Sequence, residues 1–267
     1  MTRVALVTGA ADGIGRETAR QLAEQGWHVL VHGRTEANAR NAVISNFETD
    51  ASTTPVWANF EAMDEVADLA TQVSRLTPTV DALINDAGMY AKKRKLTADG
   101  FESTMAVNHF APFLLTLSLL PQLVAAENVR VVTVSSMTHS GASLNLSDLS
   151  FSHRWNSYDA YSSSKLADIL FIRSLAIELK NTRVTANALH PGVVDTKLLS
   201  EAFAMSGTSI RDCARTSLYL TTSAKVASIT GKYFVDCLEQ SSSATSRDAH
   251  LAAALLAISR HSLATYL

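Results

Sequence analysis

One tyrosine in this sequence has a neighbour that could make it an acid/base group. Of the six tyrosines, only Tyr161 is followed four residues later by a lysine, Lys165, and on a helix this spacing places both side chains on one face. A phenol ordinarily titrates near pH 10, and a nearby ammonium favours the phenolate, which predicts a lowered pKa. Ser135 and Ser136 close an apolar run upstream. A hydroxyl from one of them could bind the oxygen with which Tyr161 exchanges its proton.

The elements that must position these groups alternate between short apolar runs and helical segments. The strands predicted from these runs are Val4–Thr8, His28–His32, Val56–Ala58, Ala82–Asn85, Arg130–Ser135, Val184–Leu189 and Lys232–Asp236. The predicted helices are Ile14–Glu24, Thr35–Asn46, Met63–Leu76, Phe101–Val124, Tyr158–Glu178 and Asp248–Ser259. This order predicts an α/β fold, a doubly wound parallel sheet forming a single domain over residues 1–267. The loops after the strands then share one edge, where ligands bind.

A glycine-rich turn follows the first predicted strand and opens the first predicted helix. It runs from Thr8 to Gly15 and contains Gly9, Gly13 and Gly15, with Asp12 and Ile14 between them. Glycine lets the backbone turn tightly and approach a pyrophosphate, and a helix N-terminus offers free N–H groups to it. A glycine motif alone is a weak signal, but its position here predicts a dinucleotide site and a Rossmann fold.

The end of the second predicted strand bears on which dinucleotide is bound. An acidic residue there would bind the adenosine ribose, but the sequence has Gly33 and Arg34. Arg34 could hold a 2′-phosphate, which favours NADP, with NAD as the alternative. Two considerations oppose a preference for NADP. Arg34 could equally be a solvated helix-capping residue, and Asp12 could repel the same phosphate.

Taken together, these motifs resemble those of the short-chain dehydrogenase/reductase family across nearly the whole chain. Besides the glycine turn, Asn85–Gly88 is similar to the family's NNAG motif with Asp86 replacing the second asparagine, and Asn108 stands where the family has a helix asparagine. Ser136 and the Tyr161–Lys165 pair are similar to the catalytic serine and YxxxK. Residues 190–196 are similar to the segment that contains PGxxxT.

The resemblance implies a role for each matching residue. Ser136 would position the substrate oxygen, Tyr161 would transfer the proton, Lys165 would bind the nicotinamide ribose and lower the pKa of Tyr161, and Asn108 would hold a relay water. The cofactor-binding residues implied by the motifs are Gly9, Asp12, Gly13, Ile14, Gly15, Arg34, Asn59, Phe60, Asn85, Ala87, Gly88, Tyr161, Lys165, Pro191, Gly192, Val193 and Thr196. Of these, Val193 and Thr196 would contact the carboxamide, and Asn59 the adenine amine.

Several stretches resemble the retinol-dehydrogenase-like branch of that family. They are Asp99–Glu102, Val107–Phe110, Tyr161–Ala167 and Gly231–Cys237. That branch implies NADP-dependent interconversion of lipophilic alcohols and carbonyls. Because a fold does not fix a substrate, lipophilicity is here an expectation from resemblance. The segment 197–216 is expected to form a lid over the substrate, or alternatively an ordinary amphipathic helix with a loop.

Composition excludes other classes of function. A formal net charge of −2 argues against nucleic acid as a partner, and the basic run Lys92–Lys95 is expected to be a solvated loop, although it could attract a substrate carboxylate. Two cysteines, Cys213 and Cys237, form no metal or disulfide pattern, so we expect no metal and a cytoplasmic location. The apolar stretch Phe110–Ala126 contains two prolines and is short for a membrane span.

Three functions remain open at this stage. The first is an oxidoreductase acting on a small-molecule alcohol or ketone. The second is a non-catalytic dinucleotide sensor or scaffold on the same fold, and the third is a sugar-nucleotide epimerase or dehydratase, which shares the Tyr and Lys but spaces its glycines differently. The two long predicted helices form the usual dimer face of the family, so a homo-oligomer is possible.

Overall fold

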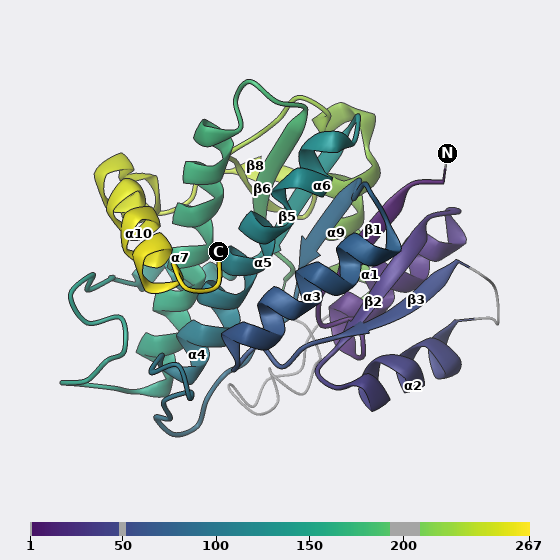
Figure 1. The fold of residues 1–267 in the computed structure, drawn as a ribbon. Coiled ribbons are helices and arrows are strands. Elements are labelled where there is room, and N and C mark those ends of the chain that lie inside the picture. Colours follow the sequence, from purple (N-terminus) through teal and green to yellow (C-terminus); the bar gives the residue numbers. More distant parts are fainter. Residues whose placement is uncertain (1, 48–51, 193–208) are drawn as a thin grey trace.

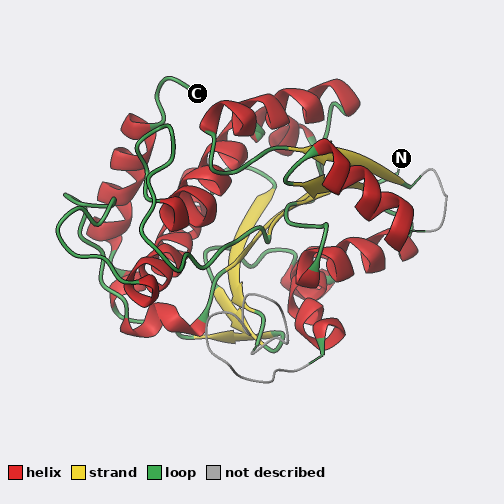
Figure 2. Cartoon of the chain, turned by 90° about the horizontal axis from the view of Figure 1, so that it is seen from below, coloured by secondary structure: helices red, strands yellow, loops and turns green. Residues whose placement is uncertain are grey.

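The computed structural model describes residues 2–47, 52–192 and 209–267, which form an eight-stranded sheet with helices on both faces (Figure 1, Figure 2). The strand order is β3-β2-β1-β4-β5-β6-β7-β8, and all neighbouring pairs are parallel except β7 with β8. The strands are β1 Val4–Val7, β2 His28–Gly33, β3 Thr53–Trp57, β4 Ala82–Asn85, β5 Val129–Val134, β6 Val184–His190, β7 Tyr233–Val235 and β8 Leu238–Gln240. The predicted doubly wound Rossmann sheet is therefore confirmed.

The helices cover the two faces of this sheet and create two apolar layers. They are α1 Gly13–Glu24, α2 Glu36–Asn46, α3 Met63–Leu76, α4 Ser103–Met105, α5 Ala111–Ser118, α6 Leu120–Ala125, α7 Ser157–Glu178, α9 Ile210–Thr222 and α10 Ala249–Ser262. In β5, Val129 and Val131 pack into the layer that contains α3, α5 and α7, while Val132 and Val134 pack into the layer that contains α1 and α9. Burial on both faces explains why the strands are continuous apolar runs.

The long helix predicted over Phe101–Val124 is divided into four pieces. After α4, the residues Ala106–Phe110 form a π-helical turn (η1) before α5 begins. A second break falls at Leu119, where φ is −92° and ψ is 1°. Pro121 follows, and a proline has no N–H to continue the hydrogen-bond ladder, so α6 has to restart there. The prediction was wrong about continuity and correct about helical character.

The hairpin of β7 and β8 was not predicted. Its turn consists of Asp236 and Cys237, whose φ values are 49° and 63°. Two-residue hairpin turns require positive φ, for which glycine and asparagine are the usual signal. Neither residue type is present, so the local sequence carries no warning of the turn. The strand β3 also begins at Thr53, three residues before its predicted start.

The C-terminal helix α10 lies across α7 (Figure 1). His109 Nε2 is 2.9 Å from Ser259 Oγ, and Arg260 forms an ion pair of 2.8 Å with Glu178. Helix α10 thus covers part of the helix face on which a homo-oligomer was expected, and that assembly remains a prediction. No helix in the described part of the chain is long and apolar enough to cross a membrane.

Candidate active site

The predicted catalytic side chains meet at the carboxyl edge of the sheet. Asn156 caps α7 by accepting a hydrogen bond from Asp159 N, and Tyr161 and Lys165 follow within the first turns. Ser136 lies just after β5 and shares a hydrogen bond with the hydroxyl of Tyr161. Tyr161 and Ser136 are each 8% exposed and Lys165 is 5% exposed. The site therefore combines a phenol, a hydroxyl and an ammonium with little access to bulk water.

The structure distinguishes the two candidate serines. Ser135 Oγ donates to the main-chain carbonyl of Lys165 at 2.7 Å, so its hydroxyl holds α7 against the end of β5. Ser136 Oγ instead accepts from Thr138 N at 3.3 Å and faces Tyr161. Successive side chains of an extended chain point to opposite sides, which accounts for the different partners of the two serines.

Lys165 forms a buried ion pair that the sequence analysis did not predict. Its Nζ donates to Asp168 Oδ2 at 3.0 Å and to the Val134 carbonyl at 2.8 Å. Burial raises the pKa of Asp168 to about 6 despite the nearby ammonium. Burial alone would lower the pKa of Lys165, but the charges of Asp168 and Tyr161 outweigh it and raise that pKa. The i,i+3 spacing of Lys165 and Asp168 on a helix was the available signal.

The pKa of Tyr161 differs in direction from the prediction. Burial raises it above the ordinary value of a tyrosine, while the charge of Lys165 and the hydrogen bond with Ser136 act to lower it. The carboxylates of Asp168 and Asp86 raise it further. Desolvation outweighs the ammonium here because the phenolate is the charged form that burial disfavours.

Asn108 lies in the π-helical turn and links two parts of the site. Its Oδ1 accepts from Met89 N at 2.8 Å, and its Nδ2 donates to the Met89 carbonyl and to Ser164 Oγ at 3.0 and 2.9 Å. Ser164 stands between Tyr161 and Lys165 on α7. Asn108 therefore fixes the loop after β4 against the catalytic helix, and single π turns often occur at functional sites.

The glycine-rich turn has the shape that a dinucleotide requires. Gly9 and Gly13 have φ values of 67° and 58°, which favour glycine. A Cβ on Gly9 would lie 2.9 Å from Ala87 Cα, and one on Gly15 would lie 2.7 Å from the Gly9 carbonyl oxygen. The backbone of β1, the turn and the loop after β4 are thus in close contact. The turn lies where the strand order reverses around β1 and β4, which is the position of dinucleotide sites in such sheets.

A buried histidine that was not predicted supports this turn. His32 Nδ1 accepts from Gly9 N at 3.1 Å, and its Nε2 lies 3.1 Å from the Ala58 carbonyl. Burial lowers the pKa of His32 to about 4, so the ring is neutral with its proton on Nε2. The ring also stacks on Phe60 at 4.6 Å between centroids. A lone histidine at the end of β2 carries no motif that would have revealed this role.

The predicted adenosine end contains Arg34 in an exposed ion pair. Its side chain is 70% exposed and lies 3.4 Å from Glu61, which also pairs with Lys95 at 2.9 Å. Asn59 Oδ1 accepts from Glu61 N at 3.2 Å, so one acceptor position of this amide is already used. Gly33 leaves no spare room, because a Cβ there would lie 2.5 Å from Ala39 N. Arg34 and Lys95 are therefore both paired with the carboxylate of Glu61.

The remaining predicted residues differ in how close they lie to the catalytic cluster. Gly88 belongs to the site, since a Cβ there would lie 3.5 Å from Asn108 Oδ1 and 3.8 Å from Lys165 Nζ. Asn85 points away from the cluster, and its Nδ2 donates at 3.3 Å to Thr116 on α5 and to a threonine of β5. Ala87, Pro191 and Gly192 lie in loops at the carboxyl edge of the sheet, and Ile14 lies in the first turn of α1.

Two predicted features fall wholly or partly outside the described residues. Val193, Thr196 and residues 197–208 of the expected lid are not described. The described part, residues 209–216, begins helix α9, where Cys213 and Ala214 are buried. Two histidines, His139 and His190, also lie at the carboxyl edge of the sheet. His139 is fully bonded, to the Ser136 carbonyl at 2.6 Å and to Ser243 N at 3.2 Å, which agrees with a structural role.

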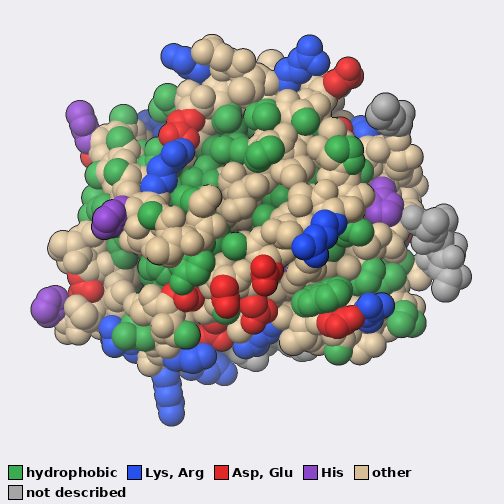
Figure 3. Space-filling model, in the orientation of Figure 1, with side chains coloured by type: hydrophobic (Ala, Val, Ile, Leu, Met, Phe, Trp, Pro, Cys, Tyr) green, Lys and Arg blue, Asp and Glu red, His purple; other side chains and the backbone are tan. Residues whose placement is uncertain are grey.

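On the face shown in Figure 3, basic and acidic side chains are intermixed, and neither charge dominates the surface. In the basic run, Lys95 pairs with Glu61, and Arg94 donates to the Ser150 carbonyl at 3.1 and 3.0 Å. Among the described residues, no cluster of three metal-ligating side chains occurs.

A parallel sheet with a glycine turn at its switch point and a buried Ser–Tyr–Lys cluster defines the class of nicotinamide-dependent oxidoreductases. Comparison with known proteins makes the family explicit, because a family model described as short chain dehydrogenase matches residues 3–207. The chain belongs to the short-chain dehydrogenase family and is an NAD(P)-dependent dehydrogenase acting on CH–OH groups.

Its relatives point to one branch of that family. Retinol dehydrogenase 14 of Mus musculus is 34% identical over 264 residues, which cover 89% of this chain and 79% of that protein. Polyprenol dehydrogenase of Mus musculus is 36% identical over 271 residues, covering 93% and 80%. The structure of a short chain dehydrogenase from Shigella flexneri complexed with NADP matches with a TM-score of 0.72 and 25% identity, covering 88% of this chain and 97% of that one. The resemblance to the retinol-dehydrogenase-like branch is confirmed.

Proposed function

We propose that this protein interconverts a lipophilic alcohol and its carbonyl compound with NADP(H). The observation that carries the proposal is the buried contact between Ser136 and Tyr161 beside Lys165, at the edge of the sheet where the glycine turn lies. Nζ of Lys165 lies 5.9 Å from the centre of the Tyr161 ring. A site that only bound a dinucleotide would not need a serine, a tyrosine and a lysine buried together in this way.

The cofactor, when bound, accepts or supplies the hydride. In the oxidising direction, Ser136 Oγ donates a hydrogen bond to the substrate oxygen and orients it against Tyr161. The hydroxyl of Tyr161, as phenolate, takes the alcohol proton, and Lys165 stabilises the phenolate through its charge. In the reducing direction, the same hydroxyl returns the proton to the carbonyl oxygen. Asn108 is proposed to hold a relay water, and Lys165 to bind the nicotinamide ribose.

Apolar side chains near the catalytic groups support a lipophilic substrate. Met137 follows Ser136 directly and is 56% exposed, and Tyr158, three residues before Tyr161, is 46% exposed. The ring of Tyr90 lies 5.4 Å from that of Tyr161. Relatives named for retinol and polyprenol, both long apolar alcohols, support the same choice.

NADP as the preferred cofactor is supported by Arg34 and by the NADP complex of the Shigella flexneri relative. Arg34 can turn from Glu61 towards a 2′-phosphate, with which a guanidinium forms two parallel hydrogen bonds. We expect Arg34→Ala to weaken NADPH binding by about tenfold and to leave NADH binding nearly unchanged. Calorimetry with both cofactors measures this, and equal weakening would remove Arg34 from the site. The expected cytoplasmic location stays a prediction.

The decisive experiment combines calorimetry with turnover. Binding of NADPH is measured first, and the reduced nicotinamide absorbance is then followed with a panel of lipophilic ketones and alcohols. We expect Tyr161→Phe to retain cofactor binding and to lower kcat at least about a hundredfold, which is typical for loss of a general acid. Binding without turnover on the whole panel would favour a dinucleotide sensor. Wild-type rates in Tyr161→Phe would exclude the proposed mechanism.

A further inference from the structure

The serine of the catalytic cluster opens a short 3₁₀ turn at the end of β5. This turn, η2, spans Met137–Gly141, and Ser136 caps it. Ser136 Oγ accepts from Thr138 N, and the Ser136 carbonyl accepts from His139 N, both at 3.3 Å. Both bonds are long, and the hydrogen-bond geometry of 3₁₀ turns is poor. The backbone alone therefore holds the Ser136 hydroxyl only loosely against Tyr161.

The side chain of His139 strengthens this turn. Its ring is buried, and Nδ1 lies 2.6 Å from the Ser136 carbonyl, much closer than His139 N does to the same oxygen. Nε2 accepts from the backbone N–H of Ser243 at 3.2 Å, so the ring is the neutral tautomer and Nδ1 donates to Ser136. Burial lowers the pKa of His139, which keeps the ring uncharged at neutral pH. The ring thus links Ser243 to the main chain of Ser136.

The partners of the ring are themselves fixed. The ring of Tyr233, at the start of β7, meets that of His139 edge to face, with 4.9 Å between centroids. Ser243 is held by the buried Ser246, whose hydroxyl donates to the Ser243 carbonyl at 2.8 Å and whose N–H donates to Ser243 Oγ at 3.2 Å. The segment after β8 is therefore a rigid support for His139, although Ser243 lies 104 positions further along the chain.

We propose that His139 is a positioning residue, which holds the Ser136 hydroxyl against Tyr161 through the main chain of η2, and that the segment after β8 fixes His139 in turn. The inference rests on the proposed function, which gives Ser136 the contact with the substrate oxygen. Without the bond from His139, η2 loosens and the Ser136 hydroxyl is no longer held at Tyr161. The hydrogen bond with Ser136 acts to lower the pKa of Tyr161, so its loss makes the phenolate harder to form.

Two substitutions separate the two bonds of the ring, because an asparagine amide reaches as far as Nδ1 and a glutamine amide as far as Nε2. His139→Asn can donate to Ser136 but cannot accept from Ser243, and His139→Gln has the opposite capacity. We expect His139→Asn to keep kcat within about threefold of the wild type and His139→Gln to lower it about ten- to a hundredfold, as a misplacement of about 1 Å can do. The probe is the alcohol of the lipophilic panel that the wild type oxidises fastest. NADPH binding, measured by calorimetry, should be unchanged in both variants.

Two readouts distinguish positioning from a general loss of stability. In His139→Gln, the acid limb of the pH–rate profile of alcohol oxidation should move to higher pH, because Tyr161 loses a bond that favours its phenolate. In a Ser136→Ala background, His139→Gln should not lower kcat further, since residues that act through one another are not additive. The other charged groups that act on Tyr161 are the same in every variant, namely Lys165, Asp168 and Asp86.

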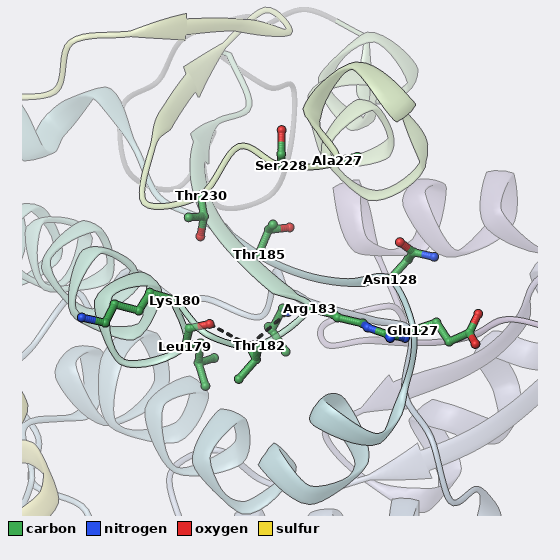
Figure 4. A pocket seen from close by; sticks show the side chains of 11 residues that line it. Glu127, Asn128, Leu179, Lys180, Thr182, Arg183, Thr185, Ala227, Ser228 and Thr230 are labelled. Carbon is green, nitrogen blue, oxygen red and sulfur yellow. Dashed lines mark hydrogen bonds between the residues drawn. The ribbon is translucent and has the colours of Figure 1, made fainter.

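The matched control loses a bond of the same kind at the opposite edge of the sheet. There the loops that precede β5, β6 and β7 surround a cavity of about 500 Å³, beside which Thr182 Oγ1 donates to the Leu179 carbonyl at 2.7 Å (Figure 4). Thr182→Val removes that bond far from the catalytic cluster. It should lower the free energy of unfolding and leave kcat and the pH–rate profile as in the wild type.

The remaining outcomes each overturn the proposal. Equal losses of kcat in His139→Asn and His139→Gln, with an unshifted pH–rate profile, would show that the ring only supports the fold. Additive effects of His139→Gln and Ser136→Ala would show that His139 does not act through Ser136. If His139→Gln does not fold, His139→Asn decides alone, because the proposal requires it to keep the wild-type kcat. A wild type that binds NADPH but oxidises no alcohol would overturn the proposed function together with this inference, whereas an active wild type matched by His139→Gln would overturn this inference alone.

Discussion

Asp86 stands where the NNAG motif of the short-chain dehydrogenase family has an uncharged asparagine. Replacing Asp86 by asparagine should show how the carboxylate changes the stability of the protein with pH. The carboxylate accepts a hydrogen bond from the backbone N–H of Gly15 and lies within the charge field of Lys165. Thr8 Oγ1 accepts from the backbone N–H of Asp86 at 3.0 Å, which fixes the residue beside the glycine turn. Burial nevertheless raises the pKa of Asp86 from 3.8 to about 7.

The sign and size of the effect on stability follow from proton linkage. The folded state holds the proton of Asp86 more tightly than the unfolded state, whose aspartates titrate near 3.8 to 3.9. Below the unfolded pKa both states are protonated and stability is unaffected. As the pH rises from about 4 to about 7, the wild type loses stability, by at most about 4 kcal/mol at 1.36 kcal/mol for each pKa unit. Because Asp86 as a whole residue keeps part of its surface exposed, solvent screening reduces this figure, and we expect a loss of about 2–4 kcal/mol.

The variant Asp86→Asn should therefore be the more stable protein at pH 8, and the difference should shrink to about 1 kcal/mol or less at pH 4.5. Urea unfolding at several pH values, followed by circular dichroism, gives the difference in the free energy of unfolding. Other titrating groups are common to both proteins and cancel in the difference. Asp68→Asn, at an exposed position on α3, is the control and should show no such trend. A difference between Asp86→Asn and wild type that does not change with pH would refute the reasoning.

Three further predictions concern the network around Tyr161, the adenosine end and the fold. Asp168→Asn should move the acid limb of the pH–rate profile of alcohol oxidation to lower pH, because the carboxylate raises the pKa of Tyr161. Glu61→Gln should tighten NADPH binding severalfold without affecting NADH, because it frees Arg34, and calorimetry measures both. Gly33→Ala should lower the free energy of unfolding by about 2–4 kcal/mol, since its Cβ would lie 2.5 Å from a backbone nitrogen, as urea titration would show.

Each of these three has an outcome that contradicts it. Gly141→Ala is the control for Gly33→Ala, because nothing lies within 4 Å of its added methyl group, and equal losses in both would show that packing at Gly33 is not tight. A pH–rate profile that stays in place in Asp168→Asn would show that this carboxylate does not act on Tyr161. Equal changes in the affinities for NADPH and NADH in Glu61→Gln would show that Glu61 does not influence binding of the 2′-phosphate.

Local patterns predicted most of the sheet, because buried parallel strands are short apolar runs that end at polar turns. They failed where the structure depends on distant contacts. The division of residues 101–124 includes a π turn at Asn108, which is held by Met89 and Ser164, residues far from it in sequence. The hairpin at Asp236 and Cys237 adopts positive φ without glycine.

The site was predicted in a similar way. Tyr161 and Lys165 were found from their types and spacing and Ser136 from the family resemblance, and the structure places all three in one cluster. The carboxylate of Asp168 and the ring of His32 were missed. Asp168 stands three residues after Lys165, a spacing already visible in the sequence, whereas His32 accepts from Gly9, a partner that only the fold brings near. For the same reason the net direction of the Tyr161 pKa could not be predicted from Lys165 alone.

The strand order has a consequence for how the chain folds during synthesis. Strand β1 pairs with β2 and β4, and Val4 N donates to Asp81 Oδ2 across 77 positions of sequence. At a synthesis rate of about 5–20 residues per second, β1 waits roughly 4–15 s for the strand that completes its pairing. Until then its second edge is open, and non-local pairing of this kind slows folding. The unpaired edge of β1 should thus have to be shielded from other chains while the protein is being synthesised. A circular permutant beginning at residue 78 would not shorten the wait, since β4 would then be made first and β1 only after β8.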